Sequence, residues 1–226
     1  MSLACAACPV RDRAACAVLE EDERDALATI GRNRILKKGE VLFHAGESEA
    51  ACATLKRGAL KISATDAEGR ERILSLVHPA GFVGEMFGPY MRHDVVALGE
   101  AELCVFSGPA FADAIDRYPR LAQAVLRRTQ EDLFASRELL ALTGNAAAEQ
   151  RVGGVLLSLA RAASDSPCHP AMRFDLPLSR GELADMLGLT IETVSRTLTR
   201  LERAGAIRRV GKRGIELVDP ALLSGM

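Results

Sequence analysis

The pattern of apolar and polar residues divides the chain into a middle segment of short apolar runs and two flanking segments with helical periodicity. Between Arg34 and Ser107 the runs are short and interrupted by glycine, with turns near Gly39, Gly46, Gly58, Gly69 and Gly81. Such runs are typical of antiparallel strands joined by tight turns. The middle segment therefore predicts a barrel or jelly roll, which closes these strands economically.

A short helix is predicted before this segment, from Glu20 to Ile30, and a long one after it. Pro119 suits the first position of the long helix, and Gly144-Asn145 can end it. Along one face, small or apolar residues recur at spacings of four and three, the repeat of a coiled coil. This face, the dimer seam, consists of Ala122, Leu126, Thr129, Leu133, Ser136 and Leu140.

The dimer seam predicts a homodimer. No charged residue lies on it, so nothing on the seam opposes pairing. The alternative is that the helix uses this face to cover its own barrel. Val125, Leu139 and Leu142 form a second apolar edge that can serve that purpose, so we expect the seam to meet a copy of itself.

The stretch from Ser179 to Gly205 predicts two helices joined by a tight turn. Ser179 and Glu182 form a capping box at the start of the first helix, and Gly188 ends it. Thr190 can cap the second helix. The residues expected to be buried are Leu183, Met186 and Leu187 in the first helix and Val194, Leu198 and Leu201 in the second. This is the arrangement of a helix-turn-helix.

Basic residues concentrate around the second of these helices. From Arg196 to Arg213 there are seven basic residues and one acidic residue, Glu202, which suits contact with DNA phosphates. Glu192 and Arg196 can reach one groove floor, where arginine donates to guanine and glutamate accepts from a cytosine amino group. The alternative is a solvated helix with an internal Glu-Arg pair. Capping, turn and charge together favour DNA binding.

The flanking residues complete a DNA-binding unit. After a hinge at Asn145, Ala147 to Ala163 predicts a helix, FDLPL a short strand, and IRRVGKRGIELVD a hairpin turning between Gly211 and Gly214, which is a wing. Arg209, Lys212 and Arg213 are expected at the tip of the wing. The predicted contacts to the DNA backbone are Ser179, Thr190, Thr199, Arg200, Arg209, Lys212 and Arg213.

Composition limits the class of protein. At 226 residues and a net charge of −1, the chain is long enough for two domains, of which one carries the basic face. No apolar run has the length of a membrane span and no signal peptide opens the chain, so we expect a cytoplasmic protein with no membrane partner. The predicted barrel carries no catalytic triad or P-loop, and we expect no enzymatic activity.

In a reducing compartment, the six cysteines favour metal, redox or core roles over disulfides. Cys5, Cys8 and Cys16 form C-x2-C-x7-C in a segment too poor in large apolar residues to pack alone. This spacing suits zinc or an iron-sulfur cluster, and Arg11 and Arg13 would offset the negative charge of thiolates. These three cysteines are one ligand short of the four that such a metal centre needs.

Cys104 lies on the last predicted strand, on the same face as Glu102 and Phe106. Alone it would pass for a core cysteine, but the incomplete ligand set makes it a candidate. Cys52 and Cys168 have no other cysteine at ligand spacing. We therefore expect Cys52 to be a packing residue and Cys168 a loop residue. The remaining alternative is a thiol-redox or zinc enzyme site, which is disfavoured because no strand precedes Cys5.

The order of cysteine segment, glycine-rich β segment, long helix and winged helix-turn-helix resembles the CRP/FNR superfamily of bacterial transcription regulators across nearly the whole chain. KKGEVLFHAG, HPAGFVGE and LPLSRGELADMLGLTIETVSRTLTRLERAGAI resemble its motifs. Glu192, Ser195 and Arg196 match the E-x-x-S-R signature of the FNR branch. The resemblance implies that these three residues contact bases of an inverted repeat with TTGAT-type half-sites, and that RNA polymerase is a partner.

CAACPVRDRAAC is similar to the cysteine motif of the FnrL and FnrN subgroup. This similarity implies that Cys5, Cys8, Cys16 and Cys104 hold an oxygen-labile [4Fe-4S] cluster. The implied fold is α+β: a cysteine-rich segment (1–18), a cyclic-nucleotide-binding-like β-roll (19–117), a dimerisation helix (118–145) and a winged helix-turn-helix (146–226).

An alternative regulator would be controlled by a small anionic effector in the β-roll, near Gly84, Glu85 and Arg92. The family's cyclic-nucleotide branch has a small hydroxyl residue beside its phosphate-binding arginine. Here His93-Asp94 follows Arg92 instead, which disfavours cyclic AMP as the effector.

Overall fold

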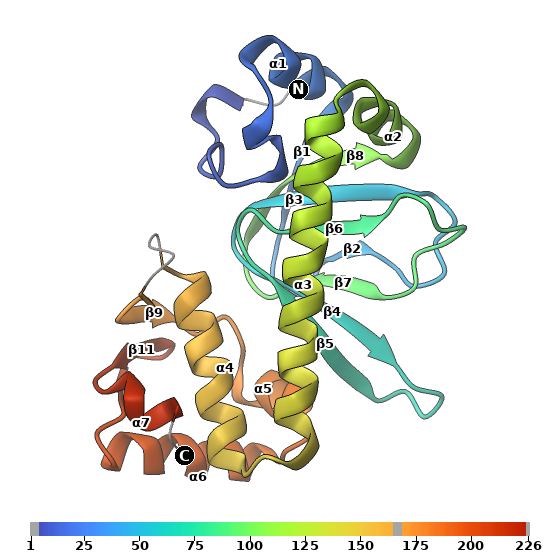
Figure 1. The fold of residues 1–226 in the computed structure, drawn as a ribbon. Helices are drawn as coiled ribbons and strands as arrows, with labels where there is room; N and C mark the ends of the chain where they lie inside the picture. The colour runs from blue at the N-terminus through green and yellow to red at the C-terminus, as the bar shows by residue number, and fades with distance from the viewer. Residues whose placement is uncertain (1–4, 165–168, 225–226) are drawn as a thin grey trace. The chain divides into compact units, whose positions relative to one another are not determined.

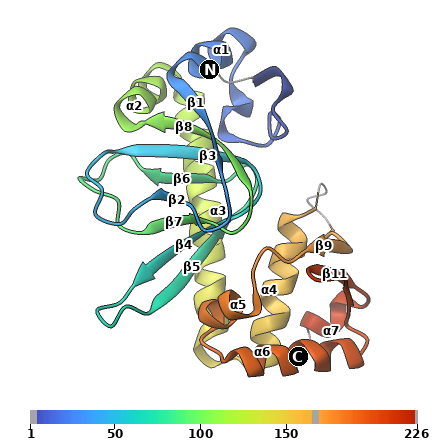
Figure 2. The same ribbon diagram turned by 180° about the vertical axis from the view of Figure 1, so that it is seen from behind.

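The computed structural model describes residues 5–164 and 169–224, which form two compact units (Figures 1 and 2). The first unit ends at Ala135 and the second begins at Ser136. Both units include part of the long helix α3 (Pro119–Asn145), whose 27 residues match the predicted helix.

In the first unit, two short 3-10 turns and helix α1 precede the strands, and helix α2 follows them (Figure 1). These helical elements are η1 (Cys5–Ala7), η2 (Ala15–Val18), α1 (Glu21–Ile30) and α2 (Gly108–Arg117). The strands are β1 (Gly31–Leu36), β2 (Val41–Phe43), β3 (Ala51–Arg57), β4 (Leu60–Thr65), β5 (Glu71–Val77), β6 (Phe82–Glu85), β7 (Asp94–Ala97) and β8 (Ala101–Ser107).

The strands form two antiparallel sheets in the orders β1-β8-β3-β6 and β2-β7-β4-β5. The core residues of the roll include Leu36, Leu55, Leu60, Leu103 and Val105. Burying this apolar surface is the main stabilising contribution to such a fold. The predicted β-roll is confirmed.

Strand β8 separates two cores because its side chains alternate between the faces of the sheet. Leu103 and Val105 point into the core of the roll. Cys104 and Phe106 belong to a second core, which includes Leu27 of α1 and Phe111 of α2. The predicted alternation is therefore correct, and it directs Cys104 away from the interior of the roll.

Gly58, in the turn between β3 and β4, shows why glycine is needed at one of the predicted turns. Its φ is +90°, and a Cβ at this position would lie 2.3 Å from the Glu100 carbonyl oxygen. A side chain would meet both backbone strain and a backbone clash. The neighbouring turns can approach closely only because residue 58 has no side chain.

In its described residues, 136–164 and 169–224, the second unit contains four further helices and a small sheet in the order β10-β11-β9. Its helices are α4 (Ala148–Ala162), α5 (Arg180–Leu187), α6 (Ile191–Arg203) and α7 (Pro220–Ser224), and its strands are β9 (Arg173–Asp175), β10 (Ile207–Val210) and β11 (Gly214–Leu217). Strands β10 and β11 form the predicted hairpin and pair with β9. The winged helix-turn-helix is therefore confirmed as the fold of this unit.

Three elements differ from the sequence expectations. Of the stretch FDLPL, only Phe174 and Asp175 lie in strand β9, since Pro177 cannot donate to a ladder. Helix α2 and helix α7 were not predicted. No helix among residues 5–164 and 169–224 combines the length and the apolar character needed to cross a membrane.

Candidate metal centre and nucleic-acid interface

The four cysteines proposed as ligands come from two distant parts of the chain. Cys5 lies in η1, Cys8 follows it, Cys16 lies in η2, and Cys104 lies on β8. All four line one pocket in the first unit. The structure thus brings the predicted set together, although no sequence spacing relates Cys104 to the other three.

Small apolar residues hold the N-terminal segment in place. Val10 and Ala14 pack on Ala80 beside Cys8 and Cys16. Ala15 and Leu19 join the second core, next to Cys104. This packing orders a segment that has no core of its own.

The environment of the pocket favours neutral thiols when no cation is bound. Burial, followed by repulsion from Cys8 and Cys5, raises the pKa of Cys16 to about 11. Burial also raises the pKa of Cys104 to about 12, with smaller contributions from the other three thiols. Burial and the neighbouring Cys8 raise the pKa of Cys5. A metal cation that replaces these protons would compensate the negative charge of the thiolates, and so reduce both the cost of burying them and their mutual repulsion.

The donor set consists of cysteines, the ligand type that holds iron-sulfur clusters. Among the described residues, no three His, Cys, Asp or Glu side chains could hold one metal ion. A single ion needs its donors at about 2.0–2.3 Å from one point. In a [4Fe-4S] cluster the four cysteines bind a larger centre. Four free cysteines lining one pocket fit that requirement.

Basic residues also line this pocket, but not the expected pair. Arg11 does line it, whereas Arg13 is exposed and its carbonyl oxygen accepts a bond from Arg128. Arg24 and Lys56, which the sequence reasoning missed, are buried in the lining. Arg24 could have been noticed, because it lies three residues before Leu27 on the buried side of α1.

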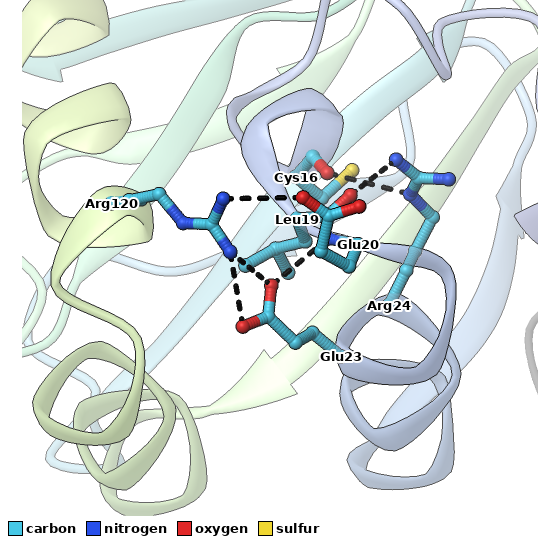
Figure 3. A network of polar contacts seen from close by, with 6 residues as sticks. All are labelled: Cys16, Leu19, Glu20, Glu23, Arg24 and Arg120. Carbon is cyan, nitrogen blue, oxygen red and sulfur yellow. Dashed lines mark hydrogen bonds and ion pairs between the residues drawn. The ribbon is translucent and has the colours of Figure 1, made fainter.

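Arg120 joins the start of α3 to the start of α1 (Figure 3). Its Nη1 donates to Glu20 Oε1 at 3.3 Å, and its Nη2 donates to Glu23 Oε2 at 2.9 Å. Further along α3, Arg128 donates to the carbonyl oxygen of Arg13. The cysteine segment is therefore bonded to α3 through Arg13, and the start of α1 is bonded to α3 through Glu20 and Glu23.

The other two cysteines lie apart from this set. Cys52 is fully buried in the second core, which confirms its packing role. Cys168 lies outside the described residues.

In the second unit, the two predicted helix caps are present. The Ser179 hydroxyl accepts from the Glu182 backbone N–H at 3.2 Å, and Gly188 ends α5 with a φ of +62°. The Thr190 hydroxyl accepts from the Thr193 backbone N–H at 3.2 Å. The Ser179 hydroxyl does not use its own hydrogen in this cap, so it can still donate to a phosphate, whereas the Thr190 hydroxyl also shares a hydrogen bond with Thr193 Oγ1 at 3.1 Å.

Helix α6 presents its polar face as predicted, with internal contacts that fix several side chains. Glu192, Arg196 and Arg200 are exposed, while Ser195 and Thr199 are half-buried. Arg196 Nη2 donates to Thr193 Oγ1 at 3.4 Å, and Arg200 pairs with Glu149. Within the described part of the chain, this long bond is the only hydrogen bond of the Arg196 guanidinium, which can therefore turn toward a base edge.

The wing carries its charge differently from the expectation. Lys212 and Arg213 are exposed in its turn. Arg209 lies on β10 rather than at the tip, where its Nε donates to Glu202 Oε2 at 2.8 Å. Since Glu202 already neutralises Arg209, we expect the wing to meet phosphates mainly through Lys212 and Arg213.

The apolar members of the dimer seam are exposed in the single chain. Leu126, Leu133 and Leu140 keep 62%, 49% and 69% of their surface accessible, whereas Val125 of the second edge is buried. Ala122 and Ser136 are half-buried, and Thr129 is exposed. Leucines left exposed at this spacing on one helix face are what an unpaired coiled-coil surface would present.

The alternative effector residues contact one another. Arg92 pairs with Glu85 at 3.4 Å, and its backbone N–H donates to Glu85 Oε1. Gly84 has a φ of +118° and packs against the Ala51 backbone. An anion at Arg92 would compete with the Glu85 carboxylate.

Comparison with known proteins identifies the family. The family model of the Crp-like helix-turn-helix domain matches residues 150–226, and that of the cyclic nucleotide-binding domain matches residues 33–118. The chain is 33% identical over 222 residues to the transcriptional activator protein FnrL of Cereibacter sphaeroides, covering 97% of this chain and 90% of that protein. The chain belongs to the CRP/FNR family of transcription regulators.

This CRP/FNR regulator has other relatives of the same kind. It is 31% identical over 197 residues to an anaerobic regulatory protein of Haemophilus influenzae, covering 86% of this chain and 76% of that protein. The solved structure of FixK2 from Bradyrhizobium japonicum matches with a TM-score of 0.77 and 25% identity, covering 86% of this chain and 96% of that chain. The regulator therefore binds DNA through its helix-turn-helix, and it belongs to a family of transcription regulators rather than of enzymes.

Proposed function

We propose that this regulator responds to oxygen through a [4Fe-4S] cluster held by Cys5, Cys8, Cys16 and Cys104. The observation that carries the proposal is the shared pocket, which collects four free cysteines from two distant segments. The names of the relatives, an FnrL activator and an anaerobic regulatory protein, support the same reading.

When bound, the cluster supplies an oxygen-labile centre that crosslinks the N-terminal segment to β8. The chain's own residues carry this restraint onward. Arg120 bonds Glu20 and Glu23, and Arg128 bonds the Arg13 carbonyl oxygen. Ordering the cysteine segment would therefore act on α3 directly through Arg13 and Arg128, while Arg120 holds α1 against the start of the same helix.

We further propose that the regulator binds DNA as a homodimer paired through the dimer seam of α3. Two α6 helices would enter successive major grooves of an inverted repeat with TTGAT-type half-sites. Glu192, Ser195 and Arg196 would contact base edges. The remaining residues would contact the DNA backbone and so position the protein on the duplex: Ser179, Thr190, Thr199, Arg200, Arg209, Lys212 and Arg213. RNA polymerase is the expected partner of the DNA-bound dimer, in the cytoplasm.

The decisive experiment is to reconstitute the protein with iron and sulfide without air and to measure its affinity for the inverted repeat before and after exposure to air. We expect affinity to fall on exposure, because loss of the centre removes the bias toward the aligned dimer. Cys104→Ala should bind weakly and show no response to air. Cys52→Ala is the matched control, since Cys52 is buried without lining the pocket.

An affinity that air leaves unchanged would contradict the oxygen switch while leaving DNA binding intact. Metal analysis separates the remaining alternatives. Iron with sulfide supports the proposal, and zinc alone supports a different metal centre. Calorimetric titration with a cyclic nucleotide tests for an effector at Gly84, Glu85 and Arg92, where we expect no heat because Glu85 pairs with Arg92.

A further inference from the structure

Arg24 is a buried cation with an unusual set of partners. The residue keeps only 9% of its surface exposed. Its Nη2 donates to the Leu19 carbonyl oxygen at 2.7 Å, and its Nε donates to the Cys16 carbonyl oxygen at 3.4 Å (Figure 3). Both acceptors are neutral backbone groups. Among residues 5–164 and 169–224, no carboxylate forms an ion pair with it.

The other buried cations of the roll are neutralised. Lys56 pairs with Glu102 at 2.5 Å, and Lys61 pairs with Glu71 at 2.6 Å. A buried charge without a counter-charge is strongly unfavourable, which is why such groups are paired in most proteins. Arg24 is the exception among these three.

Arg24 lies where an anion would neutralise it. Its side chain lines the pocket that holds Cys5, Cys8, Cys16 and Cys104. Among the described residues, no carboxylate compensates the charge that Arg24 brings to this pocket. A cluster bound by four thiolates is an anion, and it would supply the opposite charge.

We propose that Arg24 is the internal counter-cation of the cluster-binding site, an inference that rests on the proposed function. Its bonds to the Leu19 and Cys16 carbonyls hold the guanidinium beside η2, so the charge is fixed before a centre binds. Arg24 is a positioning residue, because it acts on the centre through charge and through the loop that carries Cys16. It contributes no ligand.

The test compares three full-length variants with the wild type after anaerobic reconstitution. Arg24→Gln removes the charge but keeps donors, and Arg24→Lys keeps the charge. Arg72→Gln is the matched control, because Arg72 is exposed on β5, away from the pocket lining. The readouts are iron and sulfide per chain and the midpoint potential of the bound centre.

Arg24→Gln should give a more negative midpoint potential, because a nearby positive charge stabilises the more negative reduced form. A roughly tenfold shift in the ratio of the two redox forms corresponds to about 59 mV for a one-electron couple. Arg24→Lys and Arg72→Gln should stay close to the wild type. Failure of Arg24→Gln alone to retain iron would support the same role, since its fold can be checked by circular dichroism.

Two results would overturn the inference. One is a loaded Arg24→Gln protein with the wild-type potential. The other is equal loss of iron in Arg24→Gln and Arg24→Lys, which would assign Arg24 to packing rather than charge. A wild-type chain that takes up neither iron nor sulfide would instead overturn the proposed function, and this inference with it.

Discussion

Truncating Arg196 tests whether α6 recognises sequence. In the free protein the guanidinium is exposed and makes one long bond, 3.4 Å to Thr193 Oγ1. Removing it should therefore cost the free protein little stability, and nearly the whole effect should fall on the DNA complex. A bidentate arginine–guanine contact contributes about 1–3 kcal/mol of discrimination.

In affinity, this range corresponds to a Kd about 5-fold to 150-fold higher for Arg196→Ala on its preferred duplex. The loss should shrink on duplexes changed at the contacted base pair, since the wild type has already lost the contact there. Fluorescence anisotropy with the inverted repeat and its single-base-pair variants measures both effects. Urea unfolding checks that the variant is as stable as the wild type.

Arg203→Ala is the matched control, because Arg203 is an exposed arginine on the same helix but outside the predicted base contacts. Lys212→Ala in the wing should weaken binding to every duplex alike and lower the salt dependence by about one phosphate contact. Should Arg196→Ala lose the same affinity on every duplex, the assignment of Arg196 to a base edge is wrong.

Three further predictions concern the dimer and the fold. Leu133→Glu should raise the dimer Kd by roughly 150-fold or more, because each of the two chains loses the burial of one leucine, about 1.5–3 kcal/mol. Analytical ultracentrifugation measures this Kd. Gln130→Glu, at an exposed residue off the seam, should leave the Kd unchanged. Gly188→Ala should lower the free energy of unfolding by about 1–2 kcal/mol through its φ of +62°, whereas Gly144→Ala should not. Burial lowers the pKa of His78 to about 4. The contribution of the neutral imidazole to the free energy of unfolding is then fully present above about pH 6.5 and is lost as the pH falls to about 4. In urea titrations of cluster-free protein over this pH range, His78→Gln should therefore lose about 1–3 kcal/mol less stability than the wild type.

The sequence predicts best the elements whose signals are local. The caps Ser179 and Thr190 and the stop at Gly188 all act within one helical turn, and α5 and α6 begin directly after those caps. Strand β1 shows the opposite case. Its sequence, GRNRIL, is polar and largely exposed, so it has no alternating pattern, and it becomes a strand by pairing with β8 at the sheet edge.

The candidate metal centre lies between these cases. The sequence predicts some of its cysteine ligands but not the charge balance around them. The spacing of Cys5, Cys8 and Cys16 predicts ligands but leaves the set incomplete. Cys104 joins them only because β8 alternates its faces and turns that side chain toward the N-terminal segment. Helical periodicity places Arg24 on the buried side of α1, yet periodicity cannot tell a buried arginine with a carboxylate partner from one without. That distinction requires the positions of Leu19 and Cys16, whose carbonyl oxygens take its bonds and leave its charge unbalanced. The unbalanced charge of Arg24, which would tune a cluster at this site, therefore depends on tertiary structure. Measuring its effect on the midpoint potential tests the structure rather than the cysteine motif.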